Sequence, residues 1–458
     1  RQIFAAFEKP LSHADPDGFR CVGRSWLGMA SALGTEGILR VGYVPMDRAA
    51  FKSEAGKVIH FLDETYGAGF RAPGARTLAP FPSTKTSVPG HLGLLMGLPP
   101  GANINKQQRR PRQILNMAAR GVDERETYLI ALGDMAFDSS YIFGEPARSL
   151  GLSCNTCHNK GVTNPQFFIP GISSVPGTVD VSNSFFSPHA NNGLFDPLDI
   201  PDLRGIRFTA PYGRDGRTAS LREFARNVIV SEFAGPEPSP LILDALVIYM
   251  NEFEFLPAPN LDRNGRLAAL VSDATKRGEE LFMRPFDAMG GQSCASCHVP
   301  SGHFIDHRRH DIGSGFGVTA AFDTPTLLGI AHTGPYFHDG SIETLAEVVE
   351  WFDSNVGLGL STRSKADLTA YLMAVGTGTE PYQRFDNHNS PFRLIFEELS
   401  TFLSTFDTLI LERDRFHARL LLATVSRDLR MDAAGMSNIR EHSRVLELAD
   451  RLDGVRKA

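Results

Sequence analysis

Apolar residues recur every three to four positions in several separate stretches of this 458-residue chain. The pattern covers residues 113–131, and it returns in two similar segments around Leu246–Tyr249 and Leu368–Tyr371. Residues spaced in this way lie on one face of an α-helix. A further helix is expected to open at Gly278–Phe282. The chain is therefore predicted to be mainly α-helical.

The two ends of the chain differ in how their apolar, glycine and proline residues are spaced. Glycine and proline often interrupt residues 1–120, which predicts an irregular extension packed on the rest of the protein. Residues 391–430 instead carry one long helical pattern. A second helix is expected after Gly435, with Ser437 as its N-cap. The C-terminal extension is thus predicted to be helical.

The middle of the chain contains an internal duplication. The segment Thr209-Ala-Pro-Tyr-Gly-Arg-Asp-Gly-Arg217 returns 124 residues later as Thr333-Gly-Pro-Tyr-Phe-His-Asp-Gly-Ser341, and Leu221 and Leu345 keep the same offset. The proline-rich stretch 256–260 separates the two copies. Four segments are predicted: an N-terminal extension (1–120), a first domain (121–259), a second domain (260–380) and a C-terminal extension (381–458).

Each of the two domains carries one Cys-x-x-Cys-His motif. The residues are Cys154, Cys157 and His158 in the first domain and Cys294, Cys297 and His298 in the second. Two thiols three positions apart on one helical turn can form thioethers to both vinyl groups of a haem, and the adjacent imidazole can bind the iron. The motifs therefore predict two cytochrome c-type domains with covalent haem c. His158 and His298 are the predicted iron ligands.

Three other uses of a Cys-x-x-Cys pair fit this chain less well. A zinc site would need a second ligand pair about 12 to 20 residues away, whereas the two motifs are 140 residues apart. A thioredoxin-like redox pair would lie in a βαβ context, which neither motif has, and a structural disulfide needs no histidine after it. The remaining cysteine, Cys21, is interpreted as an inert buried thiol.

The composition of the chain limits which binding partners and which cellular location are expected for the protein. A net charge of −6 and a sequence pI near 6.2 give no reason to expect nucleic acid as a partner. No apolar run approaches about 18 residues, so no membrane span is expected. The chain begins without a charged-then-apolar leader, which is expected to reflect a signal peptide already removed. Because haem c is normally attached outside the cytoplasm, a periplasmic protein is predicted.

Over residues 130–380 the sequence resembles the bacterial di-haem cytochrome c peroxidases and their MauG-type relatives. The resemblance rests on the two haem motifs, on the loop Phe304-Ile-Asp306…His310-Asp-Ile-Gly313, and on the run Thr324-Pro-Thr-Leu327…Gly334-Pro-Tyr-Phe-His-Asp-Gly340. It implies two α-helical cytochrome c domains with a haem on either side of their interface. The family often carries an interdomain calcium as well. The resemblance also implies that the first haem reacts with hydrogen peroxide while the second passes electrons.

The resemblance further implies an acid–base carboxylate in the first domain. In the family this group is a Glu about 20 residues after a Trp-Asp-Gly-Arg segment, and it moves a proton between the two peroxide oxygens. The corresponding segment here is Arg214-Asp-Gly-Arg217, and Glu232 is the nearest candidate, with a solvated carboxylate as the alternative. Arg214 replaces the family's inter-haem Trp. It could pair with a haem propionate or polarise peroxide, or it could be a surface arginine.

The distal side of the second haem departs from the family pattern. The family's ligand there, a Met or a Tyr, falls on Phe352, which cannot bind iron. The second haem is therefore expected to be five-coordinate or ligated from elsewhere, and we expect the C-terminal extension to cover its distal face. The candidate ligands in the extension are His388, His417, His442, Met431 and Met436.

Five other side chains are placed near the haems by the resemblance. His303, His307 and His310 are interpreted as part of a loop over the second haem, with a separate metal site as the alternative. Tyr212 and Tyr336 are expected near the haem edges, where a radical role is an alternative to simple packing.

The sequence as a whole predicts an oxidoreductase that reduces hydrogen peroxide with electrons from a small redox protein. The departures at Arg214 and Phe352 keep a second hypothesis open, a MauG-type or oxygenase-type enzyme that oxidises a protein or organic substrate. A third hypothesis is an electron-transfer cytochrome in which both irons are six-coordinate. The apolar helix face of the C-terminal extension leaves a homodimer as a further alternative.

Overall fold

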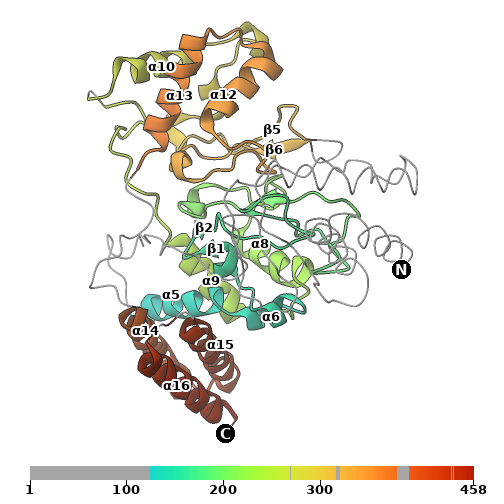
Figure 1. The fold of residues 1–458 in the computed structure, drawn as a ribbon, viewed down its shortest axis with the longest axis vertical. Helices are drawn as coiled ribbons and strands as arrows, with labels where there is room; N and C mark the ends of the chain where they lie inside the picture. Colours follow the sequence, from blue (N-terminus) through green and yellow to red (C-terminus); the bar gives the residue numbers. More distant parts are fainter. Residues whose placement is uncertain are drawn as a thin grey trace, which may run out of the picture. The chain divides into compact units, whose positions relative to one another are not determined.

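The computed structural model describes residues 124–378 and 391–457, apart from 269, 316–319, 435 and 437. The predicted N-terminal extension with Cys21 lies outside the described residues, as do Ser437 and His388. The described chain is mainly α-helical, as predicted, and its short strands form two-stranded sheets (Figure 1). None of its described helices is both long and apolar enough to cross a membrane.

The chain folds into two compact units that interleave in the sequence. Within the described residues, one unit consists of 163–201 and 333–355, and the other consists of 124–162, 202–332 and 356–457. Each unit therefore draws on both copies of the duplicated sequence. The predicted boundaries at 121, 260 and 381 follow the copies rather than the units, and they stay a prediction.

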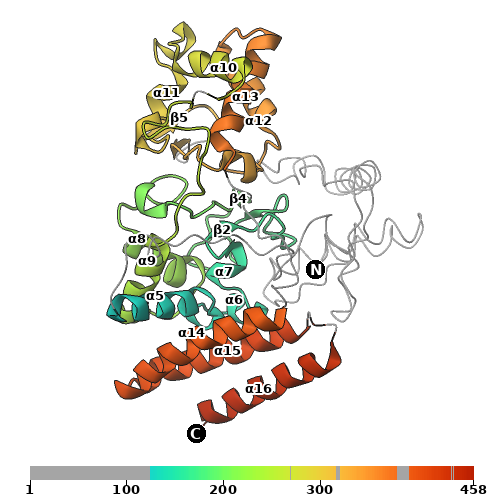
Figure 2. The ribbon, with the colours of Figure 1, turned by 90° about the vertical axis from the view of Figure 1, so that its left-hand side faces the viewer.

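Two helix pairs form the frame of the unit that contains both Cys-x-x-Cys-His motifs. Helix α5 (Glu124–Phe137) packs on α9 (Pro240–Asn251), and α10 (Asp273–Met283) packs on α13 (Thr362–Gly376) (Figures 1 and 2). The predicted helical segments at 246–249, 278–282 and 368–371 lie inside α9, α10 and α13, so these predictions are confirmed.

In each pair, a glycine allows the two helices to approach each other closely. A Cβ added to Gly133 would lie 2.1 Å from the backbone oxygen of Ala245, and a Cβ on Gly278 would lie 2.1 Å from that of Asp367. No real side chain fits at such a distance, because protein interiors are packed to van der Waals contact. The two pairs are thus built in the same way, as expected for a duplication.

The short helices after the duplicated loop are also equivalent. Helix α8 (Leu221–Asn227) begins after Ser220, and α12 (Leu345–Phe352) begins after Thr344. Each of these hydroxyls accepts a hydrogen bond from the third backbone N–H of its helix, which satisfies one of the free donors there. Each helix continues into a five-residue π-helix, η5 (Val228–Glu232) and η10 (Asp353–Gly357).

The unit of residues 163–201 and 333–355 contains little regular structure besides α12. Strand β3 (Thr178–Val179) pairs antiparallel with β4 (Leu198–Asp199). The Asp199 N–H donates to the His338 carbonyl at 2.9 Å, which joins the two chain segments of the unit. Its buried apolar side chains include Phe167, Phe168, Ile169, Ile172 and Phe186.

The C-terminal extension forms helices α14 (Pro391–Leu411), α15 (Arg415–Ala434) and α16 (Ile439–Lys457) (Figure 2). The single long pattern predicted over 391–430 is wrong in one respect, because the helix breaks after Leu411. Arg413 is left-handed with φ +59, and the Asp414 carboxylate accepts the His417 N–H at 3.1 Å as the cap of α15. Asn438 accepts the Arg440 N–H at 3.0 Å at the start of α16.

The extension packs on the first domain. Its core, which includes Phe402, Leu421 and Val445, contacts Tyr128 and Met135 of α5. These contacts differ from the expectation that the extension covers the second haem. The physical reason is that α5 presents apolar side chains outside its contact with α9, and α14 and α15 bury them.

The remaining elements are short. They are η3 (Ser140–Ile142), α6 (Ala147–Leu150), α7 (Cys154–Cys157), β1 (His158–Asn159), β2 (Val162–Thr163), η4 (Ile206–Phe208), η6 (Asp287–Met289), α11 (Cys294–Cys297), η7 (Pro300–Gly302), β5 (Arg309–Asp311), β6 (Ala321–Asp323) and η9 (Ile330–His332).

Candidate haem sites

Both Cys-x-x-Cys segments form single-turn helices with the same capping geometry. In α7 the Ser153 N–H donates to Thr156 Oγ1 at 2.9 Å, and in α11 the Ser293 N–H donates to Ser296 Oγ at 3.0 Å. The Ser/Thr side chain between the two cysteines thus closes the turn in each case. The local fold presents two thiols on one turn, directly followed by an imidazole, as a two-armed covalent attachment requires.

None of the four cysteines of these motifs forms a disulfide. Burial raises the pKa of Cys154 to about 12, with the Asp138 charge adding to the effect, and burial raises the pKa of Cys294 to about 11. A catalytic redox cysteine needs the opposite shift, since the thiolate is its reactive form. These environments therefore do not favour the thioredoxin-like alternative.

The second motif also holds its histidine as an iron ligand requires. His298 Nδ1 donates to the Phe304 carbonyl at 3.1 Å, which favours the tautomer with the lone pair on Nε2. Burial lowers the pKa of His298, so the imidazole stays neutral and able to bind a metal. Thiol pair, adjacent imidazole and backbone partner together fit a haem c.

Glu232 lies at the end of the π-helix η5, and its side chain is only 14% exposed. Its Oε1 accepts a hydrogen bond from the Arg217 guanidinium at 2.7 Å, and the same guanidinium donates to Asp215 at 2.9 Å. Burial raises the pKa of Glu232, although the Arg217 charge opposes the shift. The structure thus brings Glu232 to the Arg214–Arg217 loop, and it gives the carboxylate a partner, Arg217, that the sequence analysis did not single out.

Arg214 lies beside the second domain. Its carbonyl accepts the Asp323 N–H at 3.1 Å. Burial raises the pKa of Asp323 to about 6, and the positive charge of Arg214 acts in the opposite direction. The Arg214 side chain therefore has a carboxylate neighbour on β6, which is an alternative to the propionate and peroxide roles considered from the sequence.

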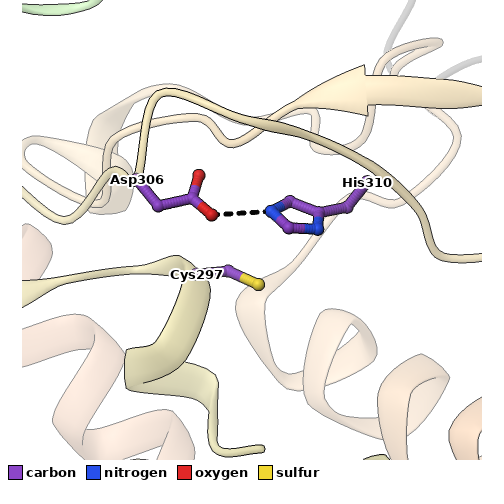
Figure 3. A group of neighbouring side chains, drawn as sticks. All are labelled: Cys297, Asp306 and His310. Atoms are coloured by element: carbon purple, nitrogen blue, oxygen red, sulfur yellow. Dashed lines mark hydrogen bonds and ion pairs between the residues drawn. The ribbon is translucent and has the colours of Figure 1, made fainter.

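The three loop histidines have three different partners. His303 stacks on Phe208 at 4.4 Å between ring centroids, and His307 Nδ1 donates to the Ala210 carbonyl at 2.7 Å. His310 Nε2 instead lies 2.7 Å from the Asp306 carboxylate. The histidines are thus not gathered into one metal site. Only His310 belongs to a group of ligand-type side chains, with Asp306 and Cys297 (Figure 3).

The two tyrosines occupy equivalent loops. Tyr212 pairs with Thr218 through backbone hydrogen bonds, and Tyr336 pairs with Ile342 in the same way. Burial raises the pKa of both phenols, that of Tyr336 to about 12, with the Asp199 charge as the second cause for Tyr336. Both phenols therefore stay protonated near neutral pH.

Phe352 and two candidate ligands of the extension, His417 and Met436, are in contact with other side chains. The Phe352 ring lies 5.1 Å from that of Trp351 and 6.2 Å from that of Phe337. His417 lies 2.7 Å from Ser239 Oγ through Nε2 and 2.5 Å from the Asp414 carboxylate through Nδ1, so both ring nitrogens have partners. Met436 packs against the core of the extension. His417 and Met436 are therefore not presented as haem ligands.

Two Cys-x-x-Cys-His motifs on this helical frame form the arrangement typical of a di-haem c-type cytochrome. Residues 273–408 match the family model described as di-haem cytochrome c peroxidase. The resemblance predicted from the sequence is confirmed. The resemblance to this di-haem family implies two haems.

Individual relatives match only parts of the chain. Hydrazine synthase subunit gamma of Kuenenia stuttgartiensis is 27% identical over 199 residues, which cover 32% of this chain and 54% of that protein. The methylamine utilization protein MauG of Methylorubrum extorquens is 26% identical over 313 residues, 59% of this chain and 84% of that protein. A solved MauG-like protein associated with microbial copper homeostasis is 19% identical with a TM-score of 0.40, covering 60% of this chain and 94% of that one.

Proposed function

We propose that this protein is a periplasmic di-haem oxidoreductase that reduces hydrogen peroxide. Haem c is attached at Cys154 and Cys157 with His158 as iron ligand, and at Cys294 and Cys297 with His298 as iron ligand. The haem of the first domain reacts with peroxide. The haem of the second domain receives electrons one at a time from a small redox protein.

A difference between the two copies supports this division of labour. The first copy has a buried carboxylate, Glu232, at the fifth position of its π-helix, and the Arg217 guanidinium holds it at 2.7 Å. At the corresponding positions the second copy has Gly357 and Ser341. Short π-helical segments are frequent at functional sites. Only the first copy therefore carries an acid–base group in this place.

The chemistry needs a proton carrier in addition to the metal. A haem held by Cys154, Cys157 and His158 would supply the electrons for the reaction, in which one peroxide takes two electrons and two protons to give two waters. The Glu232 carboxylate would accept the proton of one peroxide oxygen and return it to the other, which then leaves as water. Arg217 keeps the carboxylate in one orientation and favours its ionised form.

A MauG-like activity on a protein or organic substrate is the second candidate. It is favoured by the match to MauG over 59% of this chain, and by the departure at Arg214, which stands where the family carries an inter-haem Trp and lies beside Asp323. The same first-domain chemistry would then draw its electrons from that substrate instead of from a redox protein.

The proposal is tested by mixing the purified holo-protein with hydrogen peroxide and a reduced small cytochrome c. We expect peroxide-dependent oxidation of two cytochromes for each peroxide consumed. Consumption of peroxide without oxidation of the cytochrome would favour the MauG-like candidate. If the haems exchange electrons with the cytochrome but peroxide is not consumed, the protein is an electron carrier and the proposal is wrong.

Haem attachment is tested separately by mass. The intact denatured protein should exceed the polypeptide mass by two haems, and it should keep its colour in a denaturing gel. A Cys154→Ala, Cys157→Ala double variant should carry one covalent haem, because the second motif is unchanged. A wild-type mass equal to that of the bare polypeptide would rule out the attachment.

A further inference from the structure

A largely buried carboxylate, Asp306, lies close to the second attachment motif. The ligand-type atoms of Cys297, Asp306 and His310 all lie within 4.8 Å of one another, and Figure 3 shows the Asp306 and His310 side chains pointing toward each other above Cys297. Once Cys297 is joined to a haem, its sulfur is no longer a thiolate, which is the form that binds metals. The group is therefore unsuited to a separate metal ion and lies beside the haem attachment instead.

The Asp306 carboxylate is held in one position by three donors. His310 Nε2 lies at 2.7 Å, Thr324 Oγ1 donates at 2.8 Å and the Arg308 N–H donates at 3.0 Å. Burial acts to raise the pKa of Asp306, but these hydrogen bonds outweigh it, so the pKa lies below its usual range and the group is charged at neutral pH. With 10% of the side chain exposed, solvent screens this charge only weakly.

The loop that carries Asp306 also contacts the proximal histidine. The Phe304 carbonyl accepts from His298 at 3.1 Å, and Thr326 Oγ1 donates to the His303 carbonyl at 2.6 Å. His303, Phe304 and His307 have φ values of 59, 59 and 60, which non-glycine residues adopt only where the surroundings hold them. The carboxylate is thus part of a rigid loop that touches the second motif at both its histidine and its cysteine.

The charges around the two motifs are balanced differently. Near the first motif, Asp134 and Asp138 both pair with the Lys160 ammonium, at 3.2 and 3.0 Å. The partner of Asp306 is an imidazole, and the nearest fixed cation of its loop, Arg308, is exposed to solvent. Burial raises the pKa of Cys297, the Asp306 charge adds to the effect, and the Arg308 charge opposes it from an exposed position, where solvent screens it.

We propose that the Asp306 carboxylate stabilises the oxidised, more positively charged state of the haem attached at Cys297, and so lowers the reduction potential of that haem. Reduction potentials of haems respond to nearby charge, hydrogen bonding and burial. The carboxylate would set the driving force for electron transfer between the two haems. This inference rests on the proposed haem attachment at Cys294 and Cys297.

The test is a spectroelectrochemical titration of the Asp306→Asn holo-protein. Asparagine keeps an oxygen that accepts from Thr324 or Arg308 but removes the charge. We expect one midpoint potential to rise by about 59 mV, a tenfold change in the ratio of reduced to oxidised haem. The other haem serves as the internal reference and should not move. Asp311→Asn removes the same charge from an exposed position five residues away and should shift neither potential.

Two further results decide the outcome. If Asp306→Asn does not fold, His310→Arg, which places a fixed cation beside Asp306, should raise the same potential. The inference is wrong if the shift in the variant that folds is less than twofold, or if Asp311→Asn shifts a potential as much. A wild-type protein with fewer than two haems by mass would contradict the attachment itself. Two haems with unchanged potentials would contradict only the role of Asp306.

Discussion

Glu232→Gln should slow peroxide reduction by roughly 10²-fold or more while leaving the resting haem spectrum unchanged. The amide is close in size to the carboxylate and can still accept a hydrogen bond from Arg217. The amide cannot take a proton from peroxide at neutral pH. The O–O bond must then break without a group that carries the proton from one oxygen to the other. The measurement is the stopped-flow rate of the change in haem absorption that peroxide causes.

The pH dependence separates this role from a structural one. Because burial raises the pKa of Glu232, the wild-type rate should fall on acidification at a higher pH than an ordinary Glu would give. Arg217→Gln removes the neighbouring cation, so this pKa should rise further and the fall should move to still higher pH. The rate of the Glu232→Gln variant should not show this fall on acidification.

The matched control for this prediction is Glu237→Gln. Glu237 is an exposed carboxylate five residues further on, paired with Arg226 instead of Arg217. This variant should keep the wild-type rate and pH profile. Wild-type kinetics in Glu232→Gln would return Glu232 to the role of a structural partner of Arg217 and would point to another acid–base group.

Gly278→Ala should destabilise the protein by about 1–3 kcal/mol or more, as expected for overpacking. The added Cβ would lie 2.1 Å from the Asp367 backbone oxygen and 2.7 Å from the Tyr371 Cβ, so α10 and α13 must separate. Gly133→Ala should act in the same way on α5 and α9, where the backbone oxygen of Ala245 is equally close. The measurement is denaturant unfolding of the holo-protein followed by helical circular dichroism.

Gly454→Ala is the control for the helix-packing prediction. Gly454 lies inside α16, and an added Cβ would meet nothing within 4 Å. Alanine there should leave stability unchanged or raise it by about 0.4–1 kcal/mol, because it restricts the unfolded chain more than glycine does. If Gly278→Ala were equally harmless, the α10–α13 contact would tolerate separation and the close approach would not matter for stability.

The helical segments predicted at 246–249, 278–282 and 368–371 from local pattern were confirmed, whereas predictions that needed a partner far along the chain were incomplete. Helical periodicity located α9, α10 and α13, because the spacing of apolar residues depends only on neighbouring turns. The same reasoning missed the break after Leu411, since Asp414 caps α15 by a local hydrogen bond that leaves the apolar period largely intact. It also placed the C-terminal extension at the second haem, because an apolar helix face does not show which surface will cover it.

The sequence by itself predicted the chemistry of attachment and the resemblance to the family. Cys-x-x-Cys-His needs only one helical turn and the next residue, and the structure forms that turn twice with matching caps. Only the tertiary structure showed that Arg217 holds Glu232 and that Asp306 lies against Cys297, because hydrogen bonds and charges act across space between residues many positions apart. The identity of a ligand can be read from a local motif. The protonation of a side chain and the reduction potential of a haem depend on burial and on neighbouring groups, which are in place only after folding.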